Sequence, residues 1–349
     1  MKNSKVIIVL FAILLVHGLV LGLVLSNGCA SKKETVNNNP VQQNAEQANG
    51  ETSSALPSGQ DAKQSAREAI REPYNYAGAA SGNLPKLKTV PGRSGIVVDL
   101  ETRRVLWSRN AHKAVPIASM TKLMTLLVAY EMVEDPSNDY TLQTPVKVTR
   151  AAYMIGGSQV YLDPKETFTV EELMKAASIK SANDAAYLLA EFFGGGDVNT
   201  FVRKMNAKAA ELGMKHTKFR NPHGLPGKSA AEDNVSSPED MVRLAEATLL
   251  HPKLMEWTST WKANFRKPGT KGHMVIQNTN HLLRNGSDPC PGVDGLKTGF
   301  IRRSGYCLTA TCKRGGRRVI AVSMGHNTWK ERDRFVKDLL NWSYAQIEE

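Results

Sequence analysis

Cysteine and acidic residues are both scarce in this chain of 349 residues. Four cysteines are too few for a small scaffold built from disulfides. The three that follow the N-terminal region allow at most one bridge, so we expect no structural dependence on disulfides; they are Cys290, Cys307 and Cys312. No cluster of histidine, cysteine and aspartate has the spacing of a metal site, and the sequence predicts neither a metal nor another cofactor.

The chain does have a hydrophobic content of 41% and 22% charged residues, which together exclude wholesale disorder. Its 45 Lys and Arg outnumber 33 Asp and Glu and leave a net charge of +12. Such an excess favours anionic partners, which include nucleic acids, membrane surfaces and carboxylate-bearing substrates. Charge alone does not choose among these three classes.

The first residues carry an export pattern. Lys2 and Lys5 precede an uncharged, mostly apolar run over residues 6–25, and this order is typical of a signal sequence. The run is also long enough to span a bilayer as a helix. Cys29 follows in Leu-Ser-Asn-Gly-Cys, which resembles a bacterial lipoprotein cleavage site. We therefore expect residues 1–29 to be a signal sequence or a signal anchor. A lipidated Cys29 or an uncleaved anchor would tether the chain to a membrane, with its catalytic part outside the cytoplasm.

Composition divides the remainder into two regions. Residues 30–91 are rich in Asn, Gln, Ser, Ala, Lys and Glu and hold few large apolar side chains, so burial cannot offset their ordering entropy. We expect a disordered tether there, with a short helix over residues 62–72. Residues 92–349 are expected to form the globular domain.

Within that domain, β-type runs flank short turns at both ends. The runs at 95–100 and 105–108 predict one hairpin, and those at 304–313 and 319–324 predict another. Helical periodicity fills the interval between the hairpins, notably over residues 170–193. This order predicts an α+β fold, in which the last hairpin completes an antiparallel sheet and helices pack on it.

Three short motifs follow one another in the domain: Ser119-Met120-Thr121-Lys122, Ser181-Ala182-Asn183 and Lys297-Thr298-Gly299. The first opens an apolar helix, so its serine and lysine lie one turn apart on the same face. Serine is a weak nucleophile unless a base lies beside it, and a desolvated neutral lysine can be that base. Each motif alone is weak, since Ser259 and Lys262 repeat the first spacing and Ser81 and Asn83 repeat the second. Their order and spacing are far more specific.

The ordered motifs resemble those of the serine D,D-peptidases among the low-molecular-weight penicillin-binding proteins, the D-alanyl-D-alanine carboxypeptidase family. The resemblance runs from about residue 94 to 342 and includes segments 181–186, 212–214, 221–226 and 305–307. It implies a β-lactamase/D,D-peptidase-like fold, with a five-stranded antiparallel sheet flanked by helices and a mainly helical subdomain. It also implies a carboxypeptidase that removes the terminal D-alanine from peptidoglycan stem peptides and that β-lactams inhibit covalently.

The resemblance also implies a role for each motif residue. Ser119 would form the acyl-enzyme and Lys122 would accept the Ser119 proton. Ser181 would relay a proton to the leaving amine, and Asn183 would contact the acyl-side peptide amide. Lys297 would raise the positive potential and support the Ser181 network.

Substrate binding is implied for a second set of residues: Lys297, Thr298, Gly299, Phe300 and Arg332. Thr298 and Arg332 would hold the terminal carboxylate, and the backbone N–H groups of Ser119 and Phe300 would hold the oxyanion. The sequence departs from the family pattern at Phe300 and Ile301, where it alters contacts beside the sheet edge. It also ends at Glu349 without a C-terminal β-rich domain, so we expect the N-terminus to provide the anchor.

Several alternatives stay open at this point. The enzyme alternatives are a D,D-endopeptidase that cleaves cross-links and a β-lactamase, which needs a general base such as Glu166, Glu171 or Glu172. A non-catalytic penicillin-binding wall protein is the alternative from another class. Arg332 has a competing interpretation as part of a solvated helix face, and His223 is interpreted as structural. The basic residues near the last hairpin are interpreted as a solvated or steering face, with no nucleic acid partner.

Overall fold

The computed structural model describes residues 59–84, 87 and 89–348. Residues 1–29, including Cys29, lie outside this part, and so does the beginning of the expected tether. Within the described residues, no helix is both long and apolar enough to cross a membrane. Cys290, Cys307 and Cys312 are buried free thiols, as expected of a domain that does not depend on disulfides.

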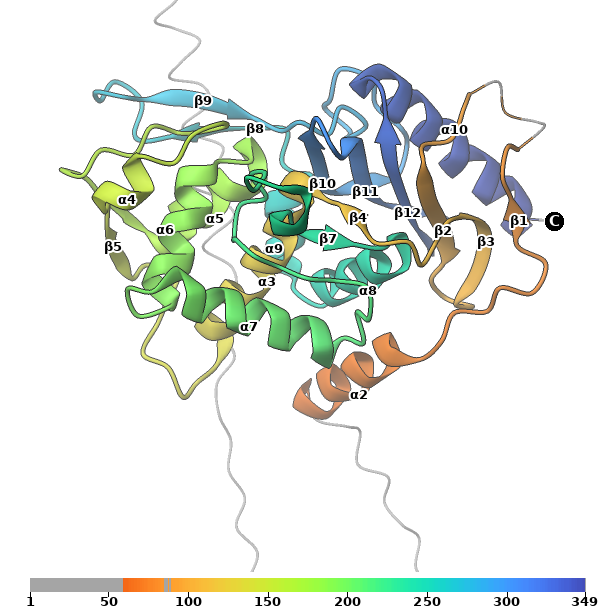
Figure 1. Ribbon diagram of the computed structural model, residues 1–349, viewed down its shortest axis with the longest axis horizontal. Helices are drawn as coiled ribbons and strands as arrows, with labels where there is room; N and C mark the ends of the chain where they lie inside the picture. Colours follow the sequence, from red (N-terminus) through yellow and green to blue (C-terminus); the bar gives the residue numbers. More distant parts are fainter. Residues whose placement is uncertain (1–58, 85–86, 88, 349) are drawn as a thin grey trace, which may run out of the picture. The chain divides into compact units, whose positions relative to one another are not determined.

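A six-stranded sheet with the order β1-β3-β2-β12-β11-β10 forms one side of the domain, on the right in Figure 1. Its strands are β1 (Ala80–Ser81), β2 (Ser94–Asp99), β3 (Arg104–Arg109), β10 (Val293–Ile301), β11 (Gly305–Arg314) and β12 (Arg317–His326). Neighbouring strands are antiparallel except β1, which pairs with β3 in parallel. Five antiparallel strands therefore form the sheet that was expected, and the two-residue β1 extends it at one edge.

Both faces of the sheet are buried. Ile96 and Val98 of β2 belong to one hydrophobic core, whereas Val97 between them belongs to the other, because successive strand residues point to opposite faces. Helix α8 (Pro238–Leu249) covers the first face and α10 (Trp329–Glu348) covers the second. The double burial explains why the middle of β2, residues 96–98, is a continuous apolar run rather than an alternating one.

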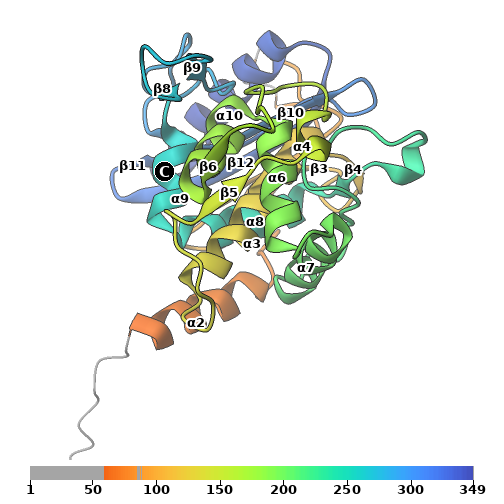
Figure 2. The same ribbon diagram turned by 90° about the vertical axis from the view of Figure 1, so that its left-hand side faces the viewer.

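A mainly helical region lies beside the sheet, and its helices face the viewer in Figure 2. It contains α4 (Arg150–Tyr153), α5 (Val170–Lys175), α6 (Asn183–Phe193) and α7 (Val198–Glu211), with β5 (Pro145–Lys147) paired to β6 (Thr167–Thr169). The helical periodicity over 170–193 is interrupted here. A π-helical turn, η2 (Ala176–Lys180), follows α5, and Ser181 then takes the left-handed conformation with φ of 62°. Such π turns are frequent at functional sites.

The remaining elements connect these two regions. They are α3 (Lys122–Glu134), α9 (Pro252–Ser259), the pair β4 (Val115–Pro116) and β7 (Val235–Ser236), the hairpin β8 (Lys262–Phe265) and β9 (Met274–Gln277), and the 3₁₀ turns η1 (Ala118–Thr121) and η3 (Ala230–Glu232). Helix α3 belongs to the core shared by both regions. Its first residue is Lys122, so the nucleophile motif lies where the two regions meet.

The described part of the expected tether contains an ordered helix, α2 (Gly59–Arg71). Ile70 and Tyr74 are 2% and 5% exposed and belong to the same hydrophobic core as Ile96 and Val98 of β2. The Tyr74 hydroxyl donates a hydrogen bond to Glu246 of α8, to which Arg103 also donates at 2.9 Å. Two large apolar side chains and this polar network hold the segment against α8, although the average composition of residues 30–91 is that of a spacer.

Candidate active site

Ser119 and Lys122 lie at the junction of η1 and α3. The Lys122 Nζ is 3.0 Å from Ser119 Oγ. It also donates to Asn183 Oδ1 at 2.7 Å and to the His223 carbonyl at 2.6 Å. Lys122 is fully buried, and burial, followed by the charge of Lys297, lowers the pKa of Lys122 well below its ordinary value. A neutral amine has two hydrogens and one lone pair. In this neutral form the two hydrogens of Lys122 would be donated to the two carbonyl oxygens, and the lone pair would be left for the Ser119 hydroxyl.

The loop that carries His223 also positions the nucleophile. Gly224 has φ of +82°, and a Cβ there would lie 2.0 Å from the Ala118 carbonyl oxygen and 2.9 Å from the Ser119 nitrogen. Any side chain at this position would therefore displace the backbone of the Ser119 turn. The His223 ring accepts a hydrogen bond from the Leu225 N–H, and burial lowers the pKa of His223 to about 3. The ring is thus a neutral structural group, in agreement with the interpretation from the sequence.

Ser181 and Asn183 approach this pair from the break between α5 and α6. Ser181 Oγ is buried and has no hydrogen-bond partner among the described residues, which is unusual for a buried hydroxyl and leaves it available to a ligand. Both ends of the Asn183 amide are engaged by protein groups, since Nδ2 donates to the Gly156 carbonyl at 2.8 Å. Gly157 gives it room, because a Cβ there would lie 2.6 Å from Nδ2. The geometry therefore gives Asn183 the task of orienting Lys122.

Strand β10 supplies the third motif at the edge of the sheet. Lys297 is 1% exposed, and burial, followed by the charge of Arg332, lowers its pKa to about 7. Thr298 shares a hydrogen bond with Thr279. A Cβ at Gly299 would lie 2.5 Å from the Ile117 carbonyl oxygen, so glycine is what allows β10 to pack against the turn that carries Ser119.

Arg332 is 3% exposed in the first turn of α10, so its competing interpretation as a solvated residue is wrong. Its Nε donates to Asp333 Oδ1 at 2.8 Å, and Nη1 donates to the Cys307 carbonyl at 3.4 Å. Asp333 Oδ2 is 2.8 Å from His281 Nδ1. One carboxylate therefore holds both the guanidinium and an imidazole at the wall of the cleft.

A cleft of about 560 Å³ runs between these elements, and its wall includes Ser119, Ser181, Thr298 and Arg332. Lys122, Asn183 and Lys297 are buried behind this wall, at 0%, 3% and 1% exposure. The Ser119 nucleophile, the Lys122 and Lys297 amines, the unpartnered Ser181 hydroxyl and the Arg332 guanidinium thus gather around one space. This is the set of groups that acyl transfer to serine needs.

The glutamates considered as a β-lactamase base lie elsewhere. Glu166 forms a two-point ion pair with Arg266, with both N···O distances 2.7 Å. Glu171 pairs with Lys175, and Glu172 caps the N-terminus of α5. No carboxylate lines the described cleft, and no three His, Cys, Asp or Glu side chains gather as metal ligands within residues 59–84, 87 and 89–348.

Comparison with known proteins identifies the family. Residues 81–328 match Peptidase_S11, described as D-alanyl-D-alanine carboxypeptidase. The chain belongs to this D-alanyl-D-alanine carboxypeptidase family. It is 38% identical over 256 residues to D-alanyl-D-alanine carboxypeptidase DacF of Bacillus subtilis. This match covers 73% of the present chain and 63% of DacF. It is 36% identical over 234 residues to a D-alanyl-D-alanine endopeptidase of Pseudomonas aeruginosa, covering 64% of this chain and 68% of that one.

Solved structures agree with this membership of the carboxypeptidase family. The ampicillin-bound Penicillin-Binding Protein D2 of Listeria monocytogenes has a TM-score of 0.63 at 30% identity, and the match covers 74% of this chain and 98% of that one. A D-alanyl-D-alanine carboxypeptidase of Mycobacterium tuberculosis has a TM-score of 0.65 at 29% identity, covering 78% and 96%. The expected penicillin-binding, D,D-peptidase-like α+β fold is confirmed.

Several residues of this family member's cleft were not singled out from the sequence. Thr279, His281 and Trp329 line the cleft beside Arg332, and Asp333 links two of the groups there. None of them lies in a motif, because the loop after β9 and the start of α10 meet through folding alone. Gly224 does have a signal, since it falls in the segment 221–226 that resembles the family.

The pKa of Lys297 predicts a pH-dependent stability. In the folded enzyme it is about 7, against an ordinary 10.5, so between these values the unfolded chain holds a proton that the folded chain lacks. Stability from this group therefore rises with pH across that window. Lys297→Met is expected to stabilise the fold most below pH about 7 and progressively less above it. Denaturant unfolding of both proteins across this range measures the difference, and a difference independent of pH would contradict the shifted pKa.

Proposed function

We propose that this chain is a serine-type D-Ala-D-Ala carboxypeptidase that removes the terminal D-alanine from peptidoglycan stem peptides. The observation that carries the proposal is the Lys122 amine, buried and 3.0 Å from Ser119 Oγ, with its hydrogens taken by two carbonyl oxygens. A base of this kind converts a serine hydroxyl into a nucleophile. Family membership supports the choice of substrate, although the chain spans 63% of the DacF relative's length.

In the first half of the reaction, Ser119 Oγ attacks the carbonyl of the penultimate residue while Lys122 takes the hydroxyl proton. The backbone N–H groups of Ser119 and Phe300 stabilise the oxyanion, and each such donor is worth about 10²–10³ in rate in comparable sites. The intermediate collapses as the peptide C–N bond breaks. Ser181, whose Oγ is otherwise unpartnered, passes its hydroxyl proton to the departing amine of D-alanine and receives in its place the proton that Lys122 took from Ser119, so that Lys122 is neutral again.

In the second half, water attacks the ester between Ser119 and the shortened peptide. Lys122 again accepts the proton, now from water, and returns it to Ser119 Oγ as the C–O bond breaks. Throughout, the free carboxylate of the substrate is the feature that selects a peptide terminus. Thr298 and Arg332 on the cleft wall provide a hydroxyl and a guanidinium for it, and Asp333 keeps the guanidinium in place.

The enzyme is proposed to act outside the cytoplasm, tethered to the membrane through its N-terminal region by a signal anchor or by lipid on Cys29. Residues 1–29 lie outside the described structure, so the support is the charged-then-apolar pattern of the sequence. The mass of the mature N-terminus tests it. A mass that carries neither lipid nor the intact apolar segment would contradict both forms of the tether.

A pentapeptide ending in D-Ala-D-Ala tests the activity directly. The full chain is expected to release D-alanine from it, to leave the product tetrapeptide intact, and to be labelled covalently by a fluorescent penicillin. A protein that is labelled and yet releases no D-alanine would contradict carboxypeptidase activity.

The endopeptidase-named relative of Pseudomonas aeruginosa supports a second substrate, a cross-linked peptide dimer. Cleavage of the dimer in preference to the pentapeptide would make endopeptidase the better description. A folded chain that neither turns over peptides nor reacts with penicillin would instead be a non-catalytic wall protein.

A further inference from the structure

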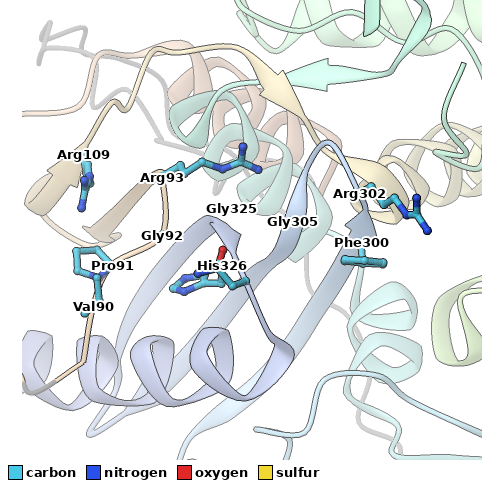
Figure 3. A pocket seen from close by; sticks show the side chains of 11 residues that line it. Val90, Pro91, Gly92, Arg93, Arg109, Phe300, Arg302, Gly305, Gly325 and His326 are labelled. Atoms are coloured by element: carbon cyan, nitrogen blue, oxygen red, sulfur yellow. The ribbon is translucent and has the colours of Figure 1, made fainter. Parts of the chain in front are cut away.

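A second pocket, of about 550 Å³, adjoins the active-site cleft. Phe300 belongs to the wall of both spaces. Its side chain is 49% exposed and stacks on Tyr306, with ring centroids 4.1 Å apart. A ligand that extends from the cleft past the face of Phe300 therefore enters this second pocket, which Figure 3 shows from close by.

Three glycines in the wall of this pocket pack closely against neighbouring segments. A Cβ at Gly92 would lie 2.9 Å from His326 Nε2, and one at Gly305 would lie 2.7 Å from the His326 carbonyl oxygen. A Cβ at Gly325 would lie 2.5 Å from Arg93 Nε. Gly305 and Gly325 also have positive φ, at +68° and +87°. Side chains at these positions would push into their neighbours, so glycine is what allows the segments that form the pocket wall to approach one another closely.

The charges around this pocket are all positive. Arg93, Arg109 and Arg302 line the pocket, and no Asp or Glu does so among the described residues. In Figure 3, Arg109 and Arg302 stand at opposite ends with Arg93 between them. Arg93 is committed to the turn after β10, because it donates to the carbonyls of Arg303 and Ser304 at 3.0 and 2.6 Å.

Arg109 and Arg302 have no hydrogen-bond or ion-pair partner in the described part of the chain, although other arginines on the sheet do. Arg303, for example, forms a two-point ion pair with Asp233, with both N···O distances 2.6 Å. Two guanidinium groups without a protein partner at the two ends of this pocket make its potential positive, which favours an anion. Guanidinium geometry suits a carboxylate or a phosphate. His326 adds no charge at neutral pH, since burial lowers its pKa to about 4.

The direction of the substrate brings a carboxylate toward this pocket. With the terminal carboxylate at Thr298 and the scissile carbonyl at the Phe300 N–H, the acyl side of the peptide leads away past Phe300. Strand β10 is the last strand of the sheet, so an extended peptide can continue along its free edge. Strand β10 ends at Ile301, and Arg302 lies in the turn that follows, two residues beyond Phe300.

We propose that this pocket is an anion-binding subsite, which binds a carboxylate on the acyl side of the substrate peptide, upstream of the scissile bond. This inference rests on the proposed carboxypeptidase function and deepens it. It assigns to Arg109 and Arg302 a selection for acidic stem peptides over neutral ones, separate from recognition of the terminal carboxylate in the cleft.

A pair of peptides tests the subsite. Both end in D-Ala-D-Ala, and one carries a side-chain carboxylate upstream where the other carries the matching carboxamide. Wild-type kcat/KM is expected to be about three- to tenfold higher for the carboxylate peptide, as one partly exposed ion pair together with attraction by the second arginine would give. The ratio should approach one in the Arg109→Gln/Arg302→Gln double variant and at high salt, where such pairs are screened.

The control is the Arg71→Gln/Arg150→Gln variant, which removes the same charge at two exposed arginines of α2 and α4 and is expected to keep the wild-type ratio. Equal wild-type kcat/KM for the two peptides would overturn the subsite while leaving the carboxypeptidase function intact. Cleavage of neither peptide would overturn the function itself. Inhibition by polyglutamate that depends on Arg109 and Arg302, without discrimination between the peptides, would show that the pocket takes a separate polymer, and it would overturn the assignment to the substrate.

Discussion

Ser119→Ala is expected to abolish both penicillin labelling and release of D-alanine. The hydroxyl is the group that becomes covalently bound, and loss of a serine nucleophile from a comparable catalytic unit lowers kcat by about 10⁴–10⁶. The fold should be unaffected, because Ser119 lies on the cleft wall and its Oγ contacts Lys122 at 3.0 Å. Fluorescent penicillin on a gel and D-alanine release from the pentapeptide measure the two effects.

The chain offers a matched control at Ser259, which has the same spacing to Lys262 as Ser119 has to Lys122. Ser259 is exposed and its hydroxyl donates to the Glu256 carbonyl at 3.0 Å, away from the cleft. The Ser259→Ala variant should therefore be labelled by penicillin and release D-alanine as the wild type does. Labelling retained by Ser119→Ala and lost by Ser259→Ala would show that the nucleophile is misassigned.

Lys122→Met should slow acylation by about 10²–10⁴-fold, the usual contribution of a general base. Met fills a similar volume without an amine. Two carbonyl oxygens, on Asn183 and His223, lose a donor, which costs about 1–3 kcal/mol for each oxygen left unsatisfied. Stopped-flow acylation by a chromogenic β-lactam measures the rate, and thermal unfolding measures the stability.

Two comparisons make the Lys122 result specific. Lys262→Met, in the repeated spacing, is the control for loss of a lysine and is expected to acylate at the wild-type rate, since Lys262 is exposed. Wild-type acylation should also increase with pH as Lys122 deprotonates, and this dependence should be absent from Lys122→Met. A folded Lys122→Met protein that acylates as fast as the wild type would remove Lys122 from the role of base.

Local patterns in the sequence were sufficient for the strands and for the nucleophile. β-type runs on either side of short turns predicted the β2–β3 and β11–β12 hairpins, because such runs separated by a few turn residues are typical of paired strands. The Ser-x-x-Lys spacing placed Ser119 and Lys122 one helical turn apart, a relation that a helix imposes by itself. The order of three motifs was enough to identify the family and its fold.

Tertiary contacts decided what no short segment encodes. The break at 176–182 that presents Ser181, the approach of Gly224 to the Ser119 turn, and the burial of Ile70 all depend on partners far along the chain. The shifted pKa values of Lys122 and Lys297 depend on them as well, because desolvation is a property of the surrounding fold. The sequence by itself therefore determines residue types and short-range spacing. Which groups meet across the cleft, and how strongly water is excluded from them, is set when distant segments pack together.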